Sequence, residues 1–86
     1  MALKLQPLRY FLWVAETGSY HAAADHAARS QPAVSLAIRD LEEQLGQPLF
    51  ERGRHAQLTP FGSEHYPQIR ALVDHHDRVS QTLSDS

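Results

Sequence analysis

Residues 28–46 (ARSQPAVSLAIRDLEEQLG) contain the pattern that most limits how this chain can fold. Apolar side chains recur there with the 3.6-residue period of a helix, at Val34, Ala37, Ile38, Leu41 and Leu45. Ser30 is a typical N-cap, Pro32 suits a first helical turn, and Gly46 suits a helix end. The pattern predicts a helix over 31–45 that buries one face. Its polar first turn must therefore serve some purpose other than burial.

Two shorter helices are predicted before it. Pro7 lies near the start of the first and Gly18 ends it, which gives a helix over 7–17. Ser19 then caps an alanine-rich run over 20–27. Their inward faces are formed by Leu8, Phe11, Leu12, Val14 and Ala15 in the first helix and by Tyr20, Ala23, Ala24 and Ala27 in the second. The connection between the second and third helices is short, as in a helix-turn-helix unit.

The segment after the third helix has the pattern of a small ribbon. Two pieces, Leu49–Arg52 and Ala56–Thr59, have strand-like composition and flank a turn that includes Gly53. A two-stranded ribbon is too small to be stable alone, so we expect it to pack against the helices as a wing. Arg52 and Arg54 in its turn suit contact with phosphate or a narrow minor groove, although a solvated hairpin turn explains them equally simply.

A long fourth helix is predicted after the ribbon. Thr59 caps it and Pro60 takes its first position, while Pro67 lacks the N–H of an interior helical bond and predicts either a bend or a later helix start. A heptad seam follows, made of His65, Ile69, Leu72, His76, Val79 and Leu83. Histidine in such a seam weakens the pairing or sets its register, and protonation at about pH 6 would add like-charge repulsion between two copies.

Composition limits the class of protein. With 86 residues the chain is one small domain with at most an appended element, and the absence of cysteine excludes disulfides and thiolate metal sites. Arg9 and Glu16 interrupt the apolar N-terminal patch, and no stretch reaches the roughly 18 to 20 apolar residues of a membrane span. These features predict a soluble, cytoplasmic protein without a membrane partner.

The net charge of −2 hides an uneven distribution. Residues 1–59 carry six basic and six acidic groups, whereas residues 60–86 carry two basic and four acidic ones. Because the first part is neutral as a whole, any affinity for phosphate must come from local clusters of arginine.

The polar first turn of the 31–45 helix suits a role in DNA binding. In a helix-turn-helix unit the later helix lies in the major groove and presents its N-terminal residues to base edges. Gln31 can pair with adenine through two hydrogen bonds, Ser35 can donate or accept, and the ring of Pro32 can contact a thymine methyl. An ordinary capped helix start is the plainer alternative.

The chain resembles the N-terminal DNA-binding domain of a LysR-type transcriptional regulator over about residues 3–85. The most specific pieces are SQPAVS at 30–35, IRDLEEQLGQPLFER at 38–52 and LTPFG at 58–62, in that order. The resemblance implies a mostly α fold, a winged helix-turn-helix of three helices and a two-stranded wing, followed by a long linker helix. The winged domain would occupy 1–59 and the linker 60–86, with the helix-turn-helix itself spanning Gly18 to Ala37.

The resemblance also implies a function. Members are bacterial regulators that bind inverted-repeat sites near promoters on double-stranded DNA. They form homodimers through the linker helix and often tetramers at full length. The residues of this chain that would pair the linkers are Ile69, Leu72, His76, Val79 and Leu83. A small-molecule effector would bind only a C-terminal domain that this chain lacks, and the resemblance implies no cofactor and no metal.

Individual positions carry over from the family, with departures at Ala22 and His26, where basic residues are common, at Arg29, where an apolar residue is usual, and at Leu36. Gln31, Pro32 and Ser35 match groove-facing positions, Arg52 matches the wing arginine of the FER motif, and Arg39 matches a basic residue near the DNA backbone. The expected DNA contacts are Ser30, Gln31, Pro32, Ser35, Leu36, Arg39, Arg52 and Arg54. Leu36 stands where the family commonly has Arg or Lys. Leucine cannot make the two hydrogen bonds with guanine that Arg can make. Either Leu36 contacts a thymine methyl at the corresponding base pair, or other residues read that base pair.

Several alternatives stay open. Arg39 can instead pair with a carboxylate on its own helix, at Asp40, Glu42 or Glu43. A winged fold can also bind protein rather than DNA. An enzyme is disfavoured, because the sequence has no Ser/His/Asp arrangement, paired carboxylates or glycine-rich phosphate loop. A metal site is disfavoured as well. The candidate ligands are His65, Asp74, His75, His76 and Asp77, and they include no pair of histidines at i and i+4.

Overall fold

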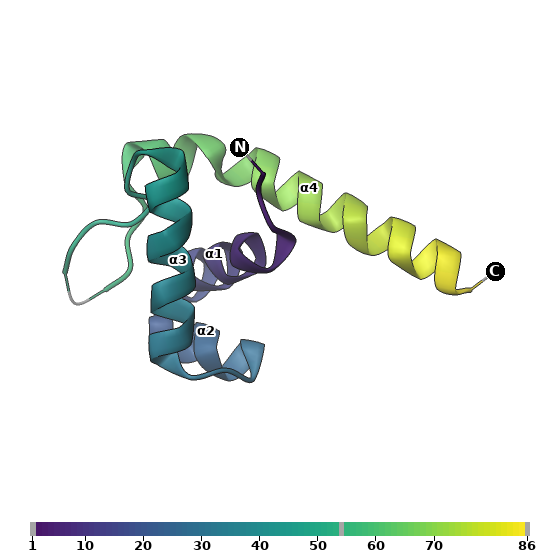
Figure 1. Cartoon of the computed structure of the whole chain (residues 1–86), viewed down its shortest axis with the longest axis horizontal. Coiled ribbons are helices and arrows are strands. Elements are labelled where there is room, and N and C mark those ends of the chain that lie inside the picture. The colour runs from purple at the N-terminus through teal and green to yellow at the C-terminus, as the bar shows by residue number, and fades with distance from the viewer. Residues whose placement is uncertain (1, 54, 86) are drawn as a thin grey trace.

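The structure, a computed structural model, describes residues 2–53 and 55–85. Within these ranges the helices are α1 (Leu5–Thr17), α2 (Tyr20–Ala27), α3 (Gln31–Leu45) and α4 (Pro60–Ser84). Residues 47–59, which join α3 to α4, are called the wing segment. It projects from one side of α3, and α4 extends in the other direction (Figure 1). None of the described helices has the length and apolarity needed to cross a bilayer.

The predicted bounds of the second and third helices are confirmed. The Ser19 hydroxyl accepts a hydrogen bond from the N–H of Ala22 at 3.0 Å, and the Ser30 hydroxyl accepts one from the N–H of Ala33 at 3.2 Å. Both serines therefore act as N-caps. The first helix differs slightly from its prediction, because it begins at Leu5, whose partly buried side chain packs against the core.

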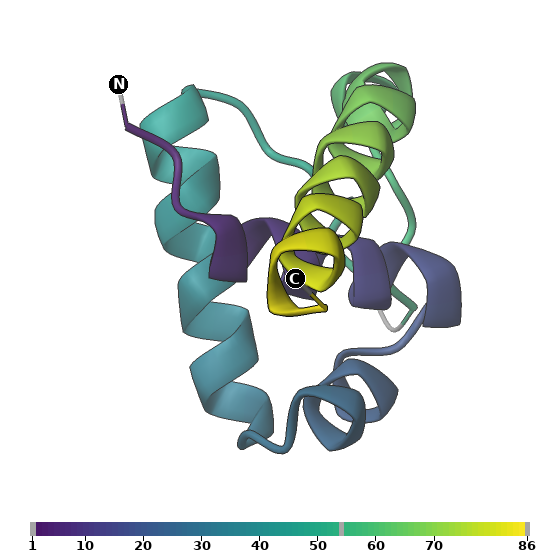
Figure 2. The same cartoon turned by 90° about the vertical axis from the view of Figure 1, so that its right-hand side faces the viewer.

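α1 is the central element of the fold. It packs against α2, α3 and α4, and in the view of Figure 2 it crosses behind α4. The core is formed by Leu8, Tyr10, Phe11, Leu12, Val14, Ala23, Ala24, Val34, Ile38, Leu41, Leu49, Phe50 and Val73. The fully buried ring of Phe11 lies 5.5 Å from that of Phe50 in the wing segment and 6.2 Å from that of Tyr66 in α4. Phe11 therefore connects both later elements to the helical body.

The wing segment is less regular than predicted. Instead of strands over 49–52 and 56–59, the described residues form a single antiparallel bridge between Phe50 and Leu58. Two backbone hydrogen bonds flank it, from Glu51 N to Gln57 O at 2.7 Å and from Thr59 N to Leu49 O at 3.0 Å. The amide of Leu49, which the next rung of the ladder would use, donates instead to the side chain of Glu42 in α3, and the amide of Phe50 donates to the same oxygen.

The start of α4 is joined tightly to the base of the wing segment. The Thr59 hydroxyl accepts from the N–H of Gly62 at 3.0 Å and donates to the carbonyl of Pro48 at 2.8 Å. Gly62 is buried against the Leu49 carbonyl, and a Cβ at this position would lie 2.4 Å from that oxygen. Only a residue without a side chain lets α4 approach the wing segment this closely.

α4 continues through Pro67 to Ser84, so the alternative of a later helix start is wrong. Pro67 is exposed, whereas Val73 is buried and Tyr66 and Ile69 pack partly against the core. Packing of this inner face on α1 keeps the helix continuous across the hydrogen bond that proline cannot make.

Ion pairs hold α4 to α1 beside these apolar contacts. Arg9 of α1 pairs with Asp77 at 2.5 Å, and hydrogen bonding to Arg9 holds the pKa of this carboxyl well below its usual range. Arg70 of α4 pairs with Glu16 of α1 and, at 2.8 Å, with Asp74; hydrogen bonding to Asp74 raises the pKa of Arg70. These pairs lie on both sides of Val73 along α4, so they oppose rotation of α4 on α1.

We expect Gly62→Ala to lower the free energy of unfolding by about 1–3 kcal/mol, because the added methyl overlaps the Leu49 carbonyl. The neighbouring exposed residue provides a control, since Ser63→Ala should change the free energy by less than about 0.5 kcal/mol. Urea unfolding followed by circular dichroism measures both. Stability of the Gly62 variant equal to or above that of the unmodified chain would contradict this account of the junction.

Candidate nucleic-acid interface

The front edge of α3 points away from the core, as predicted. Gln31 and Pro32 are exposed, Ser35 is partly exposed, and the Leu36 side chain is 58% exposed. The opposite side of the same helix contributes Val34, Ile38 and Leu41 to the core. The helix therefore separates an anchoring face from an open face, and the open face carries the residues expected to contact DNA. These residues are Ser30, Gln31, Pro32, Ser35, Leu36 and Arg39.

The N-terminus of α3 is also open. Ser30 is exposed and its oxygen accepts the N–H of Ala33, so its own hydroxyl proton is still available to a ligand. The exposed Arg29 precedes it. A helix N-terminus carries a partial positive charge and unpaired N–H groups, and both attract phosphate. The family resemblance assigned no role to Arg29, because an apolar residue is usual at this position.

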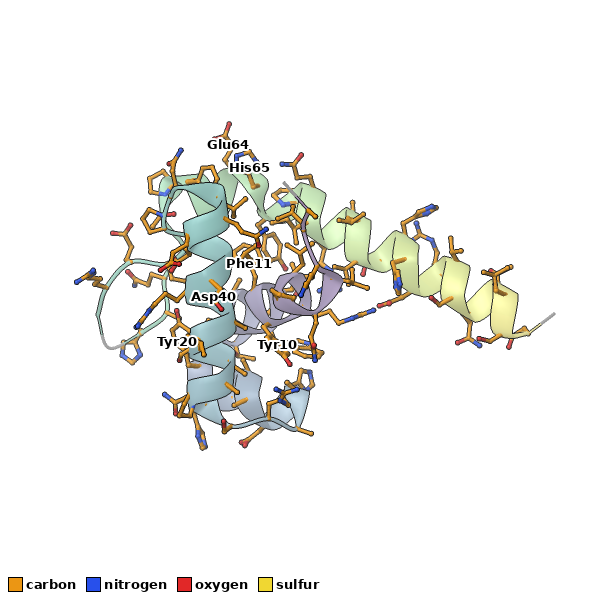
Figure 3. The ribbon with its side chains drawn as sticks, viewed as in Figure 1. Tyr10, Phe11, Tyr20, Asp40, Glu64 and His65 are labelled. Carbon is orange, nitrogen blue, oxygen red and sulfur yellow. The ribbon has the colours of Figure 1, made fainter. Side chains whose placement is uncertain are left out.

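An open groove of about 1190 Å³ runs between α3 and the wing segment. Ser35 and Arg39 line it from α3, Arg52 and Phe50 from the wing segment, and Tyr20 from α2. Figure 3 shows Tyr20 beside α3 on the side of the wing segment. The structure therefore brings three predicted contact residues, Ser35, Arg39 and Arg52, to one groove.

The arginines of this groove differ from those at the α1–α4 junction. Arg39 and Arg52 are exposed and make no ion pair with any described residue, whereas Arg9 and Arg70 are paired. The alternative in which Arg39 pairs with a carboxylate of its own helix does not occur among the described residues. Two unpaired guanidinium groups on opposite sides of one groove suit binding to a phosphate backbone. Arg54, the other predicted wing arginine, lies outside the described residues.

Glu42 determines how the wing segment sits against α3. One oxygen of its carboxylate accepts hydrogen bonds from the N–H groups of Leu49 at 2.6 Å and Phe50 at 3.3 Å. These bonds hold the base of the wing segment to α3. Glu42 was considered in the sequence only as a partner for Arg39, because a bond across seven residues has no local signal.

Tyr20 is the other groove residue that sequence reasoning missed. Periodicity places it on the inward face of α2, and its ring does pack edge-on against Phe50 at 5.9 Å. The ring also lines the groove, and partial burial, with a further contribution from Glu42, raises the pKa of its phenol. The phenol therefore stays protonated and can donate a hydrogen bond at neutral pH.

The predicted seam of α4 divides into two groups. Leu72, Val79 and Leu83 are 50%, 43% and 69% exposed. Ile69 packs partly against the core, and the His76 ring lies 3.3 Å from Arg9 and 3.2 Å from Asp77. His65, the first seam position, packs against the ring of Phe61 at 4.6 Å. The apolar surface available to a partner is therefore Leu72, Val79 and Leu83.

Comparison with known proteins finds a matching family and similar transcriptional regulators. Residues 5–63 match the family described as "Bacterial regulatory helix-turn-helix protein, lysR family". The chain is similar to the HTH-type transcriptional regulator YtlI of Bacillus subtilis (strain 168), with 34% identity over 83 residues, 96% of this chain and 27% of YtlI. It is similar to the HTH-type transcriptional regulator BenM of Acinetobacter baylyi (strain ATCC 33305 / BD413 / ADP1), with 40% identity over 78 residues, 90% of this chain and 26% of BenM.

A solved complex shares the fold. The crystal structure of BenM_DBD with catB site 1 DNA superposes with a TM-score of 0.90 and 37% identity, and the match covers 96% of this chain and 93% of that one. The chain spans about a quarter of the length of the curated relatives. What is shared is therefore the helix-turn-helix part and the helix that follows it.

We expect Glu42→Ala to lower the free energy of unfolding by about 1–3 kcal/mol, because it removes the acceptor of two partly buried amides. Glu43→Ala is the matched control. Its side chain is exposed, so the change should stay within about 0.5 kcal/mol. Thermal or urea unfolding of the two variants makes the comparison, and equal stabilities would contradict the role given to Glu42.

Proposed function

The chain belongs to the LysR family of bacterial regulatory helix-turn-helix proteins, and from this premise we propose how it reads DNA. In this proposal α3 lies in the major groove, the wing segment contacts the adjacent backbone, and two copies bind the two halves of an inverted repeat near a promoter. The observation that supports it most directly is the open front edge of α3, whose opposite face is fully used by the core. The site of action would be the nucleoid in the bacterial cytoplasm.

Base reading is assigned to the first turns of α3. The exposed amide of Gln31 can form two hydrogen bonds with an adenine edge, and Ser35 can donate to or accept from either partner of a base pair. Pro32 has no N–H and presents an apolar ring at the same edge, which suits a thymine methyl. Ser30, at the open N-terminus, is better placed for phosphate than for a base.

Phosphate binding is assigned to the two sides of the groove. Arg39 and Arg52 make no ion pair with described residues, so no internal contact has to break when they bind DNA. We also include Arg54 in this role on the basis of its sequence position alone. Because residues 1–59 have no net charge, these few arginines would provide most of the electrostatic attraction.

Dimerisation is assigned to α4, with residues 60–86 acting as the linker. Leu72, Val79 and Leu83 are spaced seven and four residues apart, so they form one apolar stripe on a helix. This stripe lies about 100° around the helix from the buried Val73, and its exposed side chains can be covered by a second copy without disturbing the core. Ile69 and His76 would lie at the edge of this contact.

The proposal is tested by selecting bound fragments from a random-sequence library with the 86-residue chain. Enrichment of an inverted repeat is the expected result. Recovery of fragments without any shared sequence would contradict specific reading by α3 and would favour a protein partner for this surface.

Substitutions in the two classes of contact should have different effects on the selected fragment. Gln31→Ala should weaken binding to it by about 1–3 kcal/mol and relax one base position, because a base contact is lost. Arg52→Ala should weaken binding to all sequences similarly and reduce the salt slope by about 1, because a phosphate contact is lost.

Affinities measured by fluorescence anisotropy at several salt concentrations, on selected and scrambled DNA, separate the two effects. Arg78→Ala is the control for loss of a positive charge, because Arg78 is exposed on α4 away from the groove. If Gln31→Ala and Arg52→Ala gave the same change on both kinds of DNA, the assignment of base and phosphate contacts would be wrong.

We expect Val79→Asp to raise the dimer dissociation constant on the order of tenfold or more, because it places an unpaired charge in the apolar stripe. Gln81→Glu adds the same charge about 180° around the helix, outside the stripe, and should leave dimerisation nearly unchanged. Sedimentation velocity over a concentration series measures both variants. A dimer that tolerates Val79→Asp as well as Gln81→Glu would exclude this face as the interface.

A further inference from the structure

Leu36 is an apolar side chain on the surface proposed to read DNA. The large apolar residues exposed in the described part of the chain are Leu3, Leu36, Leu72, Val79 and Leu83. Leu72, Val79 and Leu83 form the proposed dimer stripe, and Leu3 precedes α1. Leu36 therefore has neither the core nor the dimer interface to cover it.

The helix geometry directs Leu36 away from the core. It lies two residues from both Val34 and Ile38, which puts it about 200° around the helix from each of these buried side chains. One turn earlier on the same face stands the exposed Pro32. A leucine in a helix leans toward the N-terminus, so the two side chains form one short apolar ridge along the outer edge of α3.

The chemistry of the major groove limits what this ridge can recognise. The thymine C5 methyl is the apolar group that base pairs present there, and all other features are hydrogen-bond donors or acceptors. Leucine can make none of those hydrogen bonds. Against guanine or cytosine it would exclude water from polar edge groups and leave them unpaired, which disfavours a G·C pair at that step.

We propose that Leu36 is a specificity-determining residue that selects thymine at one position of each half-site through contact with the C5 methyl. The inference rests on the proposed function, since it requires α3 to lie in the major groove. It goes further by naming the base and the atom that this side chain recognises, and it decides between the two alternatives that the sequence leaves open for this step.

Replacement of thymine by uracil tests the contact, because uracil lacks the methyl and keeps the same hydrogen-bonding edge. On the selected fragment, single thymine-to-uracil substitutions should lower the affinity of the unmodified chain about fourfold at one position per half-site. Leu36→Ala should bind the all-thymine fragment more weakly and show no uracil penalty at that position. Leu3→Ala removes an equally sized exposed side chain, 46% exposed at the N-terminus, and should keep the full penalty.

The outcomes separate this inference from the proposed function. If Leu36→Ala kept the uracil penalty, or if no thymine position showed one although the chain bound its fragment specifically, Leu36 would have no such role and the proposed function would stand. If the chain selected no sequence at all, both would be overturned. A uracil penalty that disappears with Pro32→Ala is due to contact with Pro32. If this were the only uracil penalty observed, the proposal for Leu36 would be wrong.

A change of preference provides a second, independent test. Leu36→Arg replaces the apolar contact by a side chain that forms two hydrogen bonds with guanine. Repeated selection with this variant should return guanine where the unmodified chain returns thymine, with the rest of the motif retained. Because Leu36 is outside the core, circular dichroism should show the same fold for both. A motif that keeps thymine at this position would overturn the proposal.

Discussion

A chain of aromatic contacts holds the different parts of this small protein in place. Phe11, at the centre of α1, packs against Tyr66 of α4 on one side and Phe50 of the wing segment on the other, and Phe50 meets Tyr20 of α2. Aromatic rings bury much apolar area, so a few of them can stabilise a domain that has little core to spare. Through Phe50 the same contacts set the position of the groove beside α3.

The charged side chains have different roles in the two parts of the molecule. At the α1–α4 junction, Arg9 and Arg70 are paired with carboxylates, so their charge serves internal attachment. Around the groove, Glu42 is occupied by backbone amides while Arg39 and Arg52 have no ion-pair partner among the described residues. A chain with a net charge of −2 can in this way present individual guanidinium groups to DNA without an internal ion pair to break. Both α3 and α4 pack on α1, so α1 sets the orientation of α4 relative to α3. The α1–α4 ion pairs therefore influence how two copies would be spaced on a duplex.

The sequence predicted the helices more accurately than the segments between them. Caps and periodicity are local signals, and the bounds of α2 and α3 agree with them. The wing segment differed in part because the Leu49 amide donates to Glu42 rather than to the opposite strand, and that contact depends on residues separated in the chain. Val73 was missed as a core residue for a similar reason. A heptad pattern identifies apolar positions on α4, but it does not tell which of them α1 covers.

The amphipathic pattern of α3 was sufficient to separate its buried face from its reading edge, because both depend only on the 3.6-residue period of one helix. The local residues likewise specified where the helices start and stop. Folding in three dimensions added the groove, through the meeting of Arg39 with Arg52 and the attachment by Glu42, and it selected which face of α4 is left for a partner. These features arise from contacts between distant segments, whose geometry is set by how the helices pack and cannot be read from any one stretch of residues.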